Sequence, residues 1–311
     1  MSTLRQALDD YLALRHAMGF KLSEARIRLP QFVDFLDRQG ATFITTEWAV
    51  QWATQPRHVQ PAEWARRLRW VRGFARYHRA IDPRTEIPPT QLLPYRPQRR
   101  APYLYRDDEI AQLLEAASHL PSATGLRAHT YTAVFSLLVV TGMRISEVVG
   151  LDNDAIDLKD GLLTIRHSKF RKSRCLPLHR TTQQALGRYV EHRDQVYPIP
   201  KSPSFVVSEK GIRLTQWAVR DTFIKLSRQI GLRGPSDSHG PRLHDFRHRF
   251  AIQTLIRWYQ EDIDVERHLP ELSTYLGHVK VSDTYWYLSA TPELLGLAAR
   301  RLEQAQRRLS S

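Results

Sequence analysis

Apolar residues recur at three- or four-residue intervals through the first 80 positions, with polar residues between them. This spacing predicts a series of short amphipathic helices. Gly19 marks the end of the first helix, Thr46 is placed to cap the third, and the fourth runs from Pro61 to about Arg79. We therefore predict a compact helical domain over residues 1–82.

The second half of the chain combines longer helical patterns with a few short aliphatic runs. Residues 162–166 and 174–178 have the character of two strands joined by a basic turn, and residues 204–207 are predicted to add a third strand. Helical patterns cover residues 107–118, 127–140, 182–196, 215–230, 243–259, 265–275 and 292–309. The predicted fold class is mainly α with a small antiparallel β-sheet, in an α+β domain over residues 103–311.

Six prolines and several arginines occur from Asp82 to Pro102, both included. Proline cannot continue a helix or a central strand, so residues 83–102 are predicted to form a semi-rigid, extended linker between the two domains. Arg99 and Arg100 in this linker are suitably charged to run along a phosphate backbone.

The composition is that of a water-soluble protein. Hydrophobic residues make up 42% of the 311 residues, and no apolar run approaches the ~20 residues needed to cross a bilayer. The first 20 residues lack the apolar core of a signal peptide, so a cytoplasmic protein without a membrane partner is expected. The single cysteine, Cys175, cannot form an internal disulfide and is expected to be a buried, small apolar residue.

The formal net charge is +14, of which residues 1–100 carry +8. Such an excess favours a polyanionic partner, because neutralising phosphates releases condensed counterions. Arg69, Arg72, Arg76 and Arg79 recur at three- or four-residue steps on one face of the fourth helix. We predict that they contact DNA, although a solvated surface face would give the same pattern.

A glycine interrupts an apolar helix in the stretch Thr141-Gly142-Met143-Arg144-Ile145-Ser146-Glu147. It permits a backbone turn that would set Arg144 at the start of the next helix. A planar guanidinium can hold two phosphate oxygens at once, which lysine cannot do. Arg144 is therefore a candidate phosphate ligand, and the alternative is an ion pair with Glu147 or another carboxylate.

His244 and Arg247 lie three residues apart on a predicted helix, so both side chains can point into one pocket. Arg247 could then hold the same phosphate, and His244 could handle a proton. His244 and His248 also have the spacing of two zinc ligands. Arg247 would, however, put a cation beside the metal, and Asp245 stands where metalloproteases have glutamate. No metal site is predicted.

Lys169 lies in the basic turn between the two predicted strands. A flexible ammonium there could donate a proton to a leaving group, and Lys172 is the alternative because spacing alone does not choose between two lysines three residues apart. Arg171, Lys172 and Arg174 are predicted to contact the DNA backbone.

The last stretch is Leu276-Gly277-His278, followed by Tyr285 and Tyr287. Gly277 is predicted to end a helix and to expose His278. A phenol has a pKa near ~10 and needs adjacent cations and a proton acceptor before it can attack at neutral pH. Either tyrosine could be a nucleophile, and most tyrosines in such aromatic clusters only pack.

In order and local context, these stretches resemble the active-site pattern of the tyrosine recombinases, also called the phage integrase family. The resemblance covers roughly residues 103 to 290, while residues 258–270 are longer and more acidic than usual. It favours Tyr287 over Tyr285 as the nucleophile and Lys169 over Lys172 as the general acid. The implied catalytic set is Arg144, Lys169, His244, Arg247, His278 and Tyr287.

The resemblance also implies a helical core-binding domain and a catalytic domain that together clamp duplex DNA. Such an enzyme forms a 3′-phosphotyrosyl bond and needs no ATP, metal or other cofactor. The implied function is site-specific recombination for a mobile element, by protomers that are monomeric when free and tetrameric on synapsed DNA, with accessory or partner recombinases as possible additions. Residues 292–309 are expected to dock on a neighbouring subunit, packing on their own domain being the alternative. A nucleoid-associated, cytoplasmic protein is expected.

Two other functions remain open from the sequence. A relaxing enzyme similar to type IB topoisomerases would use the same chemistry as a monomer on one duplex. An accessory DNA-binding protein would keep the clamp without turning over.

Overall fold

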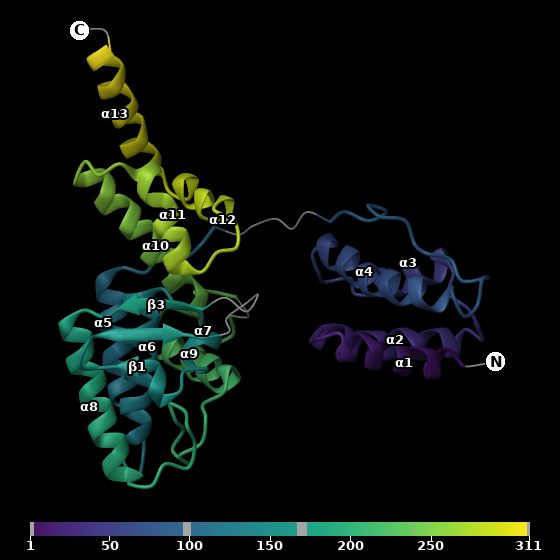
Figure 1. Ribbon diagram of the computed structural model, residues 1–311, viewed down its shortest axis with the longest axis horizontal. Helices are drawn as coiled ribbons and strands as arrows, with labels where there is room; N and C mark the ends of the chain where they lie inside the picture. The colour runs from purple at the N-terminus through teal and green to yellow at the C-terminus, as the bar shows by residue number, and fades with distance from the viewer. Residues whose placement is uncertain (1–2, 96–100, 167–172, 238, 310–311) are drawn as a thin grey trace. The chain divides into compact units, whose positions relative to one another are not determined.

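The computed structural model describes residues 3–95, 101–166, 173–237 and 239–309 (Figure 1). The chain divides into two compact units, Met1–Arg100 and Ala101–Ser311. Within the described ranges, none of the helices combines the length and apolar character that a membrane crossing requires.

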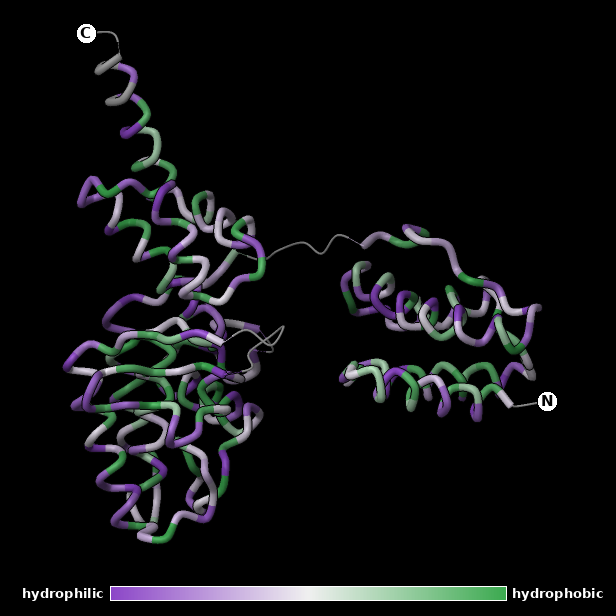
Figure 2. The backbone as a smooth tube through the Cα atoms, viewed as in Figure 1, coloured by the Kyte–Doolittle hydropathy of each residue, from purple (hydrophilic) through white to green (hydrophobic). Residues whose placement is uncertain are grey.

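The first unit is built on helices whose apolar faces pack into one core. Figure 2 shows hydrophobic and hydrophilic positions alternating around each of them, as the sequence pattern predicts. Thr45, and not the predicted Thr46, caps the third helix, because its hydroxyl accepts a hydrogen bond from the Trp48 N–H at 3.2 Å. The helices are α1 (Leu4–Ala17), α2 (Ser23–Arg38), α3 (Thr46–Thr54) and α4 (Pro61–His78).

The described part of the predicted linker, residues 83–95, lies against these helices. The Glu86 N–H donates to the Ile44 carbonyl at 2.8 Å, and the Glu86 carboxylate accepts from the Thr46 N–H at 2.8 Å. Arg72 on α4 donates to the carbonyls of Pro88 and Pro89 at 2.6 and 2.5 Å. Arg72 therefore fastens the proline-rich segment to the unit that precedes it.

The second unit has a helical body with a small antiparallel sheet, which confirms the predicted fold class. The strands are β1 (Ile156–Asp157), β2 (Leu162–Ile165) and β3 (Arg174–Pro177), in the order β1-β2-β3. Its buried core contains residues of α5 (Asp107–Ser118), α6 (Leu126–Thr141), α8 (Arg180–Val196), α9 (Gln216–Gln229) and the sheet.

Two expectations for this sheet are wrong. Residues 204–207 do not form its third strand, since they make only isolated bridges, and the Phe205 carbonyl is taken up by the side chains of Tyr189 and Arg193. Cys175 is exposed and not buried. Side chains alternate along a strand, so β3 buries Leu176 and turns Cys175 outward.

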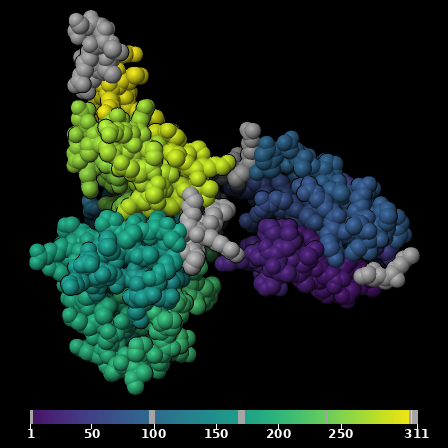
Figure 3. Space-filling model, in the orientation of Figure 1, coloured from purple at the N-terminus to yellow at the C-terminus, as the bar shows by residue number. Residues whose placement is uncertain are grey.

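The C-terminal elements form a second apolar cluster beside this body. They are α10 (Leu243–Gln260), α11 (Val265–Leu276), α12 (Ser282–Tyr285), a 3₁₀ turn η3 (Trp286–Ser289) and α13 (Pro292–Leu309). In Figure 3 the yellow-green atoms of this cluster adjoin the teal atoms of the sheet region. The bounds of α10, α11 and α13 agree within one or two residues with the helices predicted over residues 243–259, 265–275 and 292–309.

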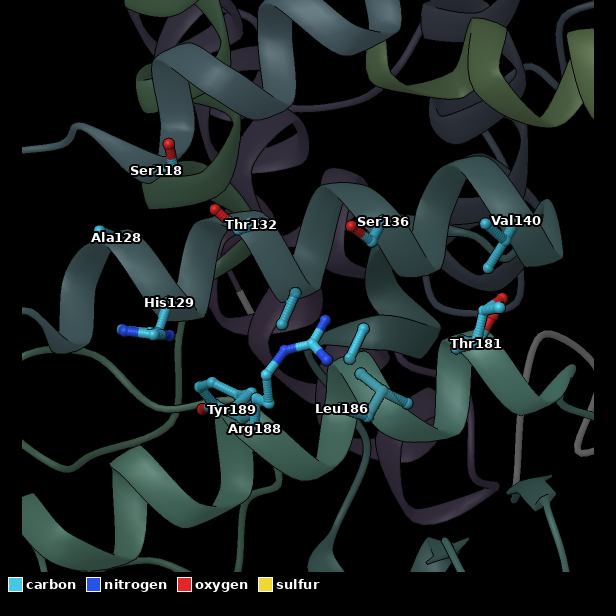
Figure 4. Close-up of a pocket in the computed structure, with 13 residues that line it drawn as sticks. Ser118, Ala128, His129, Thr132, Ser136, Val140, Thr181, Leu186, Arg188 and Tyr189 are labelled. Atoms are coloured by element: carbon cyan, nitrogen blue, oxygen red, sulfur yellow. The ribbon is translucent and has the colours of Figure 1, made fainter.

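A groove separates part of α6 from α8 in the body (Figure 4). Small side chains line the α6 side, including Ala128, Thr132 and Ser136, while Arg188 and Tyr189 line the α8 side. None of the predicted catalytic residues contributes to this lining. The predicted chemistry therefore lies elsewhere in the unit.

Candidate active site

A glycine turn places Arg144. Gly142 ends α6 in the left-handed conformation, at φ +59°, and a Cβ atom there would lie 2.9 Å from Phe250 of α10. The chain then turns, and Arg144 becomes the N-cap of the short helix α7 (Ile145–Val148), as predicted. Position 142 thus needs glycine both for its backbone angle and for the close approach of α10.

The C-terminal end of α11 gathers three arginines. Its last carbonyls lack partners within the helix and carry the negative end of the helix dipole. Arg174 donates to the Tyr275 carbonyl at 2.6 Å, Arg247 to the Leu276 carbonyl at 2.5 Å, and Arg144 to the Gly277 carbonyl at 3.3 Å. Three consecutive peptide oxygens therefore hold three guanidinium groups next to one another.

Arg247 is the most deeply buried of the three, with only 1% of its surface exposed. From α10 it reaches the Gly142 carbonyl at the end of α6, at 3.0 Å, as well as α11. Burial, together with the positive charge of Arg144, lowers the pKa of Arg247 to about 10, so it is still a cation at neutral pH. Hydrogen bonds to the Gly142 and Leu276 carbonyls offset the free-energy cost of burying this charge.

Glu147 is the carboxylate that balances the cluster. It accepts hydrogen bonds from the Arg144 side chain at 2.9 Å and from Arg174 at 3.0 and 2.9 Å. Burial would raise the pKa of Glu147, but the bonds from Arg174 and the Arg144 N–H, with their charges, lower it below its usual value. The ion pair between Arg144 and Glu147, which the sequence offered as the alternative to phosphate binding, is therefore present. The Arg144 side chain nevertheless stays 21% exposed.

Arg174 is turned into the protein, and its contact with the DNA backbone stays a prediction. Its side chain is 7% exposed, and its guanidinium is bound to Glu147 and to Tyr275. All three guanidinium nitrogens of Arg174 are engaged in these bonds. Strand alternation from buried Leu176 would have placed Arg174 on the inner face, which is the signal that sequence reasoning missed.

The histidines lie among these cations. His244 is on α10, and His278 follows the Gly277 turn, where its Nδ1 lies 2.7 Å from the hydroxyl of buried Thr284. The packed protein around each ring, with the charges of His248 and Arg247 near His244, lowers the pKa of His244 to about 4. Burial and the charges of Arg247 and Arg144 likewise lower the pKa of His278 to about 4. Both rings are therefore neutral at pH 7.

Tyr287 lies in η3 with its ring buried, at 2% exposure. It stacks on His278 with ring centroids 6.2 Å apart and an angle of 15°, and the ring of His248 is 5.6 Å away on α10. Tyr285 is 51% exposed. Of the two tyrosines, Tyr287 is the one that the structure brings to the predicted histidine, and His248 is a neighbour that the sequence argument considered only as a metal ligand.

The remaining predicted contacts divide into two groups. Arg69 and Arg76 on α4 and Arg79 at its C-cap are exposed, whereas Arg72 is half-buried and holds the proline-rich segment. Lys169, Arg171 and Lys172, and also Arg99 and Arg100, lie outside the described residues.

Among the side chains that the structure does describe, no three of His, Cys, Asp or Glu gather as a metal ion would require.

Comparison with known proteins gives the same family that the sequence motifs resemble. A family model described as the phage integrase family matches residues 104–293. The protein y4rB of Sinorhizobium fredii (strain NBRC 101917 / NGR234), named as an integrase/recombinase, is 49% identical over 308 residues, 98% of each chain.

Two solved structures share the fold at low sequence identity. The Tn1549 transposon integrase in complex with transposon right end DNA has a TM-score of 0.68 at 14% identity, covering 97% of this chain and 99% of that one. A lambda integrase tetramer bound to a Holliday junction has a TM-score of 0.59 at 20% identity, covering 90% of this chain and 78% of the other.

Proposed function

This chain belongs to the phage integrase family of tyrosine recombinases, enzymes that break and rejoin DNA, and from that premise we propose that Tyr287 is its nucleophile. The phenol oxygen attacks a phosphodiester, a 3′-phosphotyrosyl bond forms, and the 5′ oxygen of the sugar leaves as a hydroxyl. Attack by that hydroxyl on a phosphotyrosyl bond of the partner duplex then releases the tyrosine and rejoins the strands.

The observation that carries this proposal is the position of Tyr287 beside His278, next to the carbonyl row that holds Arg144 and Arg247. Arginines fixed in advance stabilise the charge that develops on a phosphorus centre at no cost in reorganisation. Because His278 is neutral, its ring can accept the phenol proton or donate to the phosphate. Since only 2% of Tyr287 is exposed, η3 must shift to bring the oxygen to DNA.

The other roles follow from position and chemistry. Arg144 and Arg247 hold the non-bridging phosphate oxygens, Arg144 through its exposed part. His244, on the same helix as Arg247, is a neutral hydrogen-bonding or proton-handling group there. Lys169 protonates the leaving 5′ oxygen.

The test is a suicide substrate, a duplex nicked so that the cleaved 5′ fragment diffuses away and the covalent intermediate accumulates. Wild-type protein should form an adduct that survives denaturation, without metal or ATP. Mass spectrometry of the digested adduct should locate the nucleotide on Tyr287. A protein that binds the duplex but never forms an adduct would be an accessory DNA-binding protein instead.

The first unit serves as the core-binding domain in this proposal. Exposed Arg69 and Arg76 on α4, with Arg79 at its C-cap, contact DNA phosphates. Replacing one of them with glutamine should lower the salt dependence of binding by about one counterion without changing cleavage at saturation. An unchanged salt slope would show that these arginines form only a solvated face.

Assembly is the remaining part of the proposal. The helix α13 is bound to its own domain by buried Leu294 and by Arg301, which donates to the Ile263 carbonyl at 2.5 Å. Leu295 and Leu302 lie seven residues apart on the same face of α13 and are 52% and 62% exposed. We place a neighbouring subunit on that face, in a tetramer on paired DNA sites; lambda integrase forms a tetramer bound to a Holliday junction.

The biological setting follows from the same family membership. Monomers would assemble on double-stranded recombination sites in the cytoplasm, at the nucleoid, to move a mobile element. Accessory or partner recombinases would act at that assembly step. The alternative function, a relaxing enzyme similar to type IB topoisomerases, would remove supercoils as a monomer and would not join two DNA sites.

A further inference from the structure

Arg174 is enclosed at the junction of three elements, each of which has a predicted catalytic residue near it in the sequence. It starts β3, its Nη1 and Nη2 donate to the two oxygens of Glu147 at 3.0 and 2.9 Å, and its Nε donates to the Tyr275 carbonyl at 2.6 Å. The fork geometry of a guanidinium meets the carboxylate with two parallel bonds while a third N–H remains for the carbonyl. One side chain therefore joins β3, α7 and α11.

Gly277 leaves the space that this arrangement needs. It ends α11 at φ +69°, and a Cβ atom at this position would lie 2.7 Å from Nη1 and 3.0 Å from Cζ of Arg174. The guanidinium thus rests directly on the backbone turn that precedes His278. A side chain at position 277 would push Arg174 away and strain the turn at the same time.

Glu147 transmits the position of Arg174 to Arg144. The carboxylate is 3% exposed and is shared between the two arginines. If Arg174 were absent, Glu147 would keep only Arg144 as a charged partner among the contacts described for it, and the pair would become a closed, neutral unit. Arg144 would then be drawn towards Glu147 and away from an incoming phosphate.

We propose that Arg174 is a positioning residue for strand cleavage. It holds Glu147 so that Arg144 keeps part of its guanidinium for the phosphate, and it fixes the turn that sets His278 beside Tyr287. It makes no contact with DNA. This inference rests on the proposed function, because the groups that it positions are those assigned to cleavage there.

The test compares Arg174→Gln and Arg174→Lys with a matched pair at Arg166, which is 47% exposed at the end of β2 and pairs with exposed Asp154 at 2.7 Å. Three quantities are measured for each variant: the Kd for duplex DNA with its salt slope, the single-turnover rate of adduct formation at saturating DNA, and the melting temperature. The two Arg174 variants should retain Kd and salt slope but lose about 10- to 100-fold or more of the saturated rate. The two Arg166 variants should retain the saturated rate.

A double-mutant cycle tests the route through Glu147. Glu147→Gln and Arg174→Gln should each slow cleavage, and the double variant should be little slower than the slower single variant, because the two residues act as one unit. Multiplied losses in the double variant would overturn that route. Gly277→Ala, which displaces Arg174 without touching its charge, should reproduce the rate loss if Arg174→Gln does not fold.

The other possible results for the Arg174 variants would each assign this residue a different role. A higher Kd with a salt slope reduced by about one, and a normal rate at saturation, would make Arg174 a DNA contact and overturn the proposal. A lower melting temperature with a normal rate well below it would reduce Arg174 to a structural role. If wild-type protein itself forms no adduct, the proposed function fails; if it does and the Arg174 variants match it, only this inference fails.

Discussion

Replacing Arg247 with lysine separates the two tasks that the structure gives this side chain. Arg247 binds the Gly142 carbonyl at 3.0 Å and the Leu276 carbonyl at 2.5 Å from a position that is 1% exposed. Lysine keeps the charge but has one nitrogen, so it cannot bridge two carbonyls and also face a phosphate. At least one buried acceptor loses its partner.

The expected cost has two components. An unsatisfied buried carbonyl costs about 1 to 3 kcal/mol in the free energy of unfolding. Loss of a preorganised donor to the transition state slows cleavage by on the order of 10² to 10³. Arg144→Lys is the comparison, because that side chain is 21% exposed and a lysine there can still pair with Glu147. It should show the rate loss with a change in stability below about 1 kcal/mol.

The assay pairs urea unfolding with single-turnover adduct formation at saturating DNA, at a temperature where both variants are folded. Arg247→Lys should lower both quantities, and Arg144→Lys only the rate. If Arg247→Lys cleaves at the wild-type rate, it has no role at the phosphate. If it cleaves slowly but unfolds like wild-type protein, the buried carbonyl bonds do not stabilise the fold as described.

Three further results are expected. Lys169→Ala should be severely slowed on normal DNA and largely rescued by a 5′-bridging sulfur, which leaves without a proton; rescue seen only for Lys172→Ala would move the general acid. Because the pKa of His278 is about 4 when folded and near 6.5 when unfolded, the unfolded chain binds more protons between these values, so stability should fall by up to about 3 kcal/mol as pH drops through that window. His278→Gln should unfold with a shallower pH dependence, and an unchanged one would refute the burial argument. Replacing Leu295 and Leu302 with serine should spare binding to a single site and abolish the synaptic complex, whereas normal recombination would exclude that face of α13 as the interface.

Local sequence signals predicted much of this fold. Glycines at 142 and 277 indicated the two turns, and both are left-handed helix ends in the structure. Helical spacing gave α10 and α11 nearly to the residue. These features depend on neighbours in the chain, which is why a single sequence can show them.

Features that depend on partners far apart in the chain were harder to predict from the sequence. Residues 204–207 have the composition of a strand, but Tyr189 and Arg193 of α8 take the Phe205 carbonyl that a neighbouring strand would use. The row of carbonyls at the end of α11 could not be foreseen, because its arginines come from three segments far apart in sequence. Strand alternation could have placed Arg174 on the inner face, but its pairing with Glu147 joins residues 27 positions apart and could not be read from the local pattern.

The central claim is that Tyr287 attacks DNA, and exposed Tyr285, at the end of the adjoining helix α12, provides a matched control. The decisive measurement is covalent adduct formation by Tyr287→Phe and Tyr285→Phe on the suicide substrate, with duplex binding measured in parallel. The account predicts that Tyr287→Phe binds DNA like wild-type protein and forms no adduct, while Tyr285→Phe forms it. An adduct with Tyr287→Phe, together with its loss in Tyr285→Phe, would contradict the account and move the nucleophile to Tyr285.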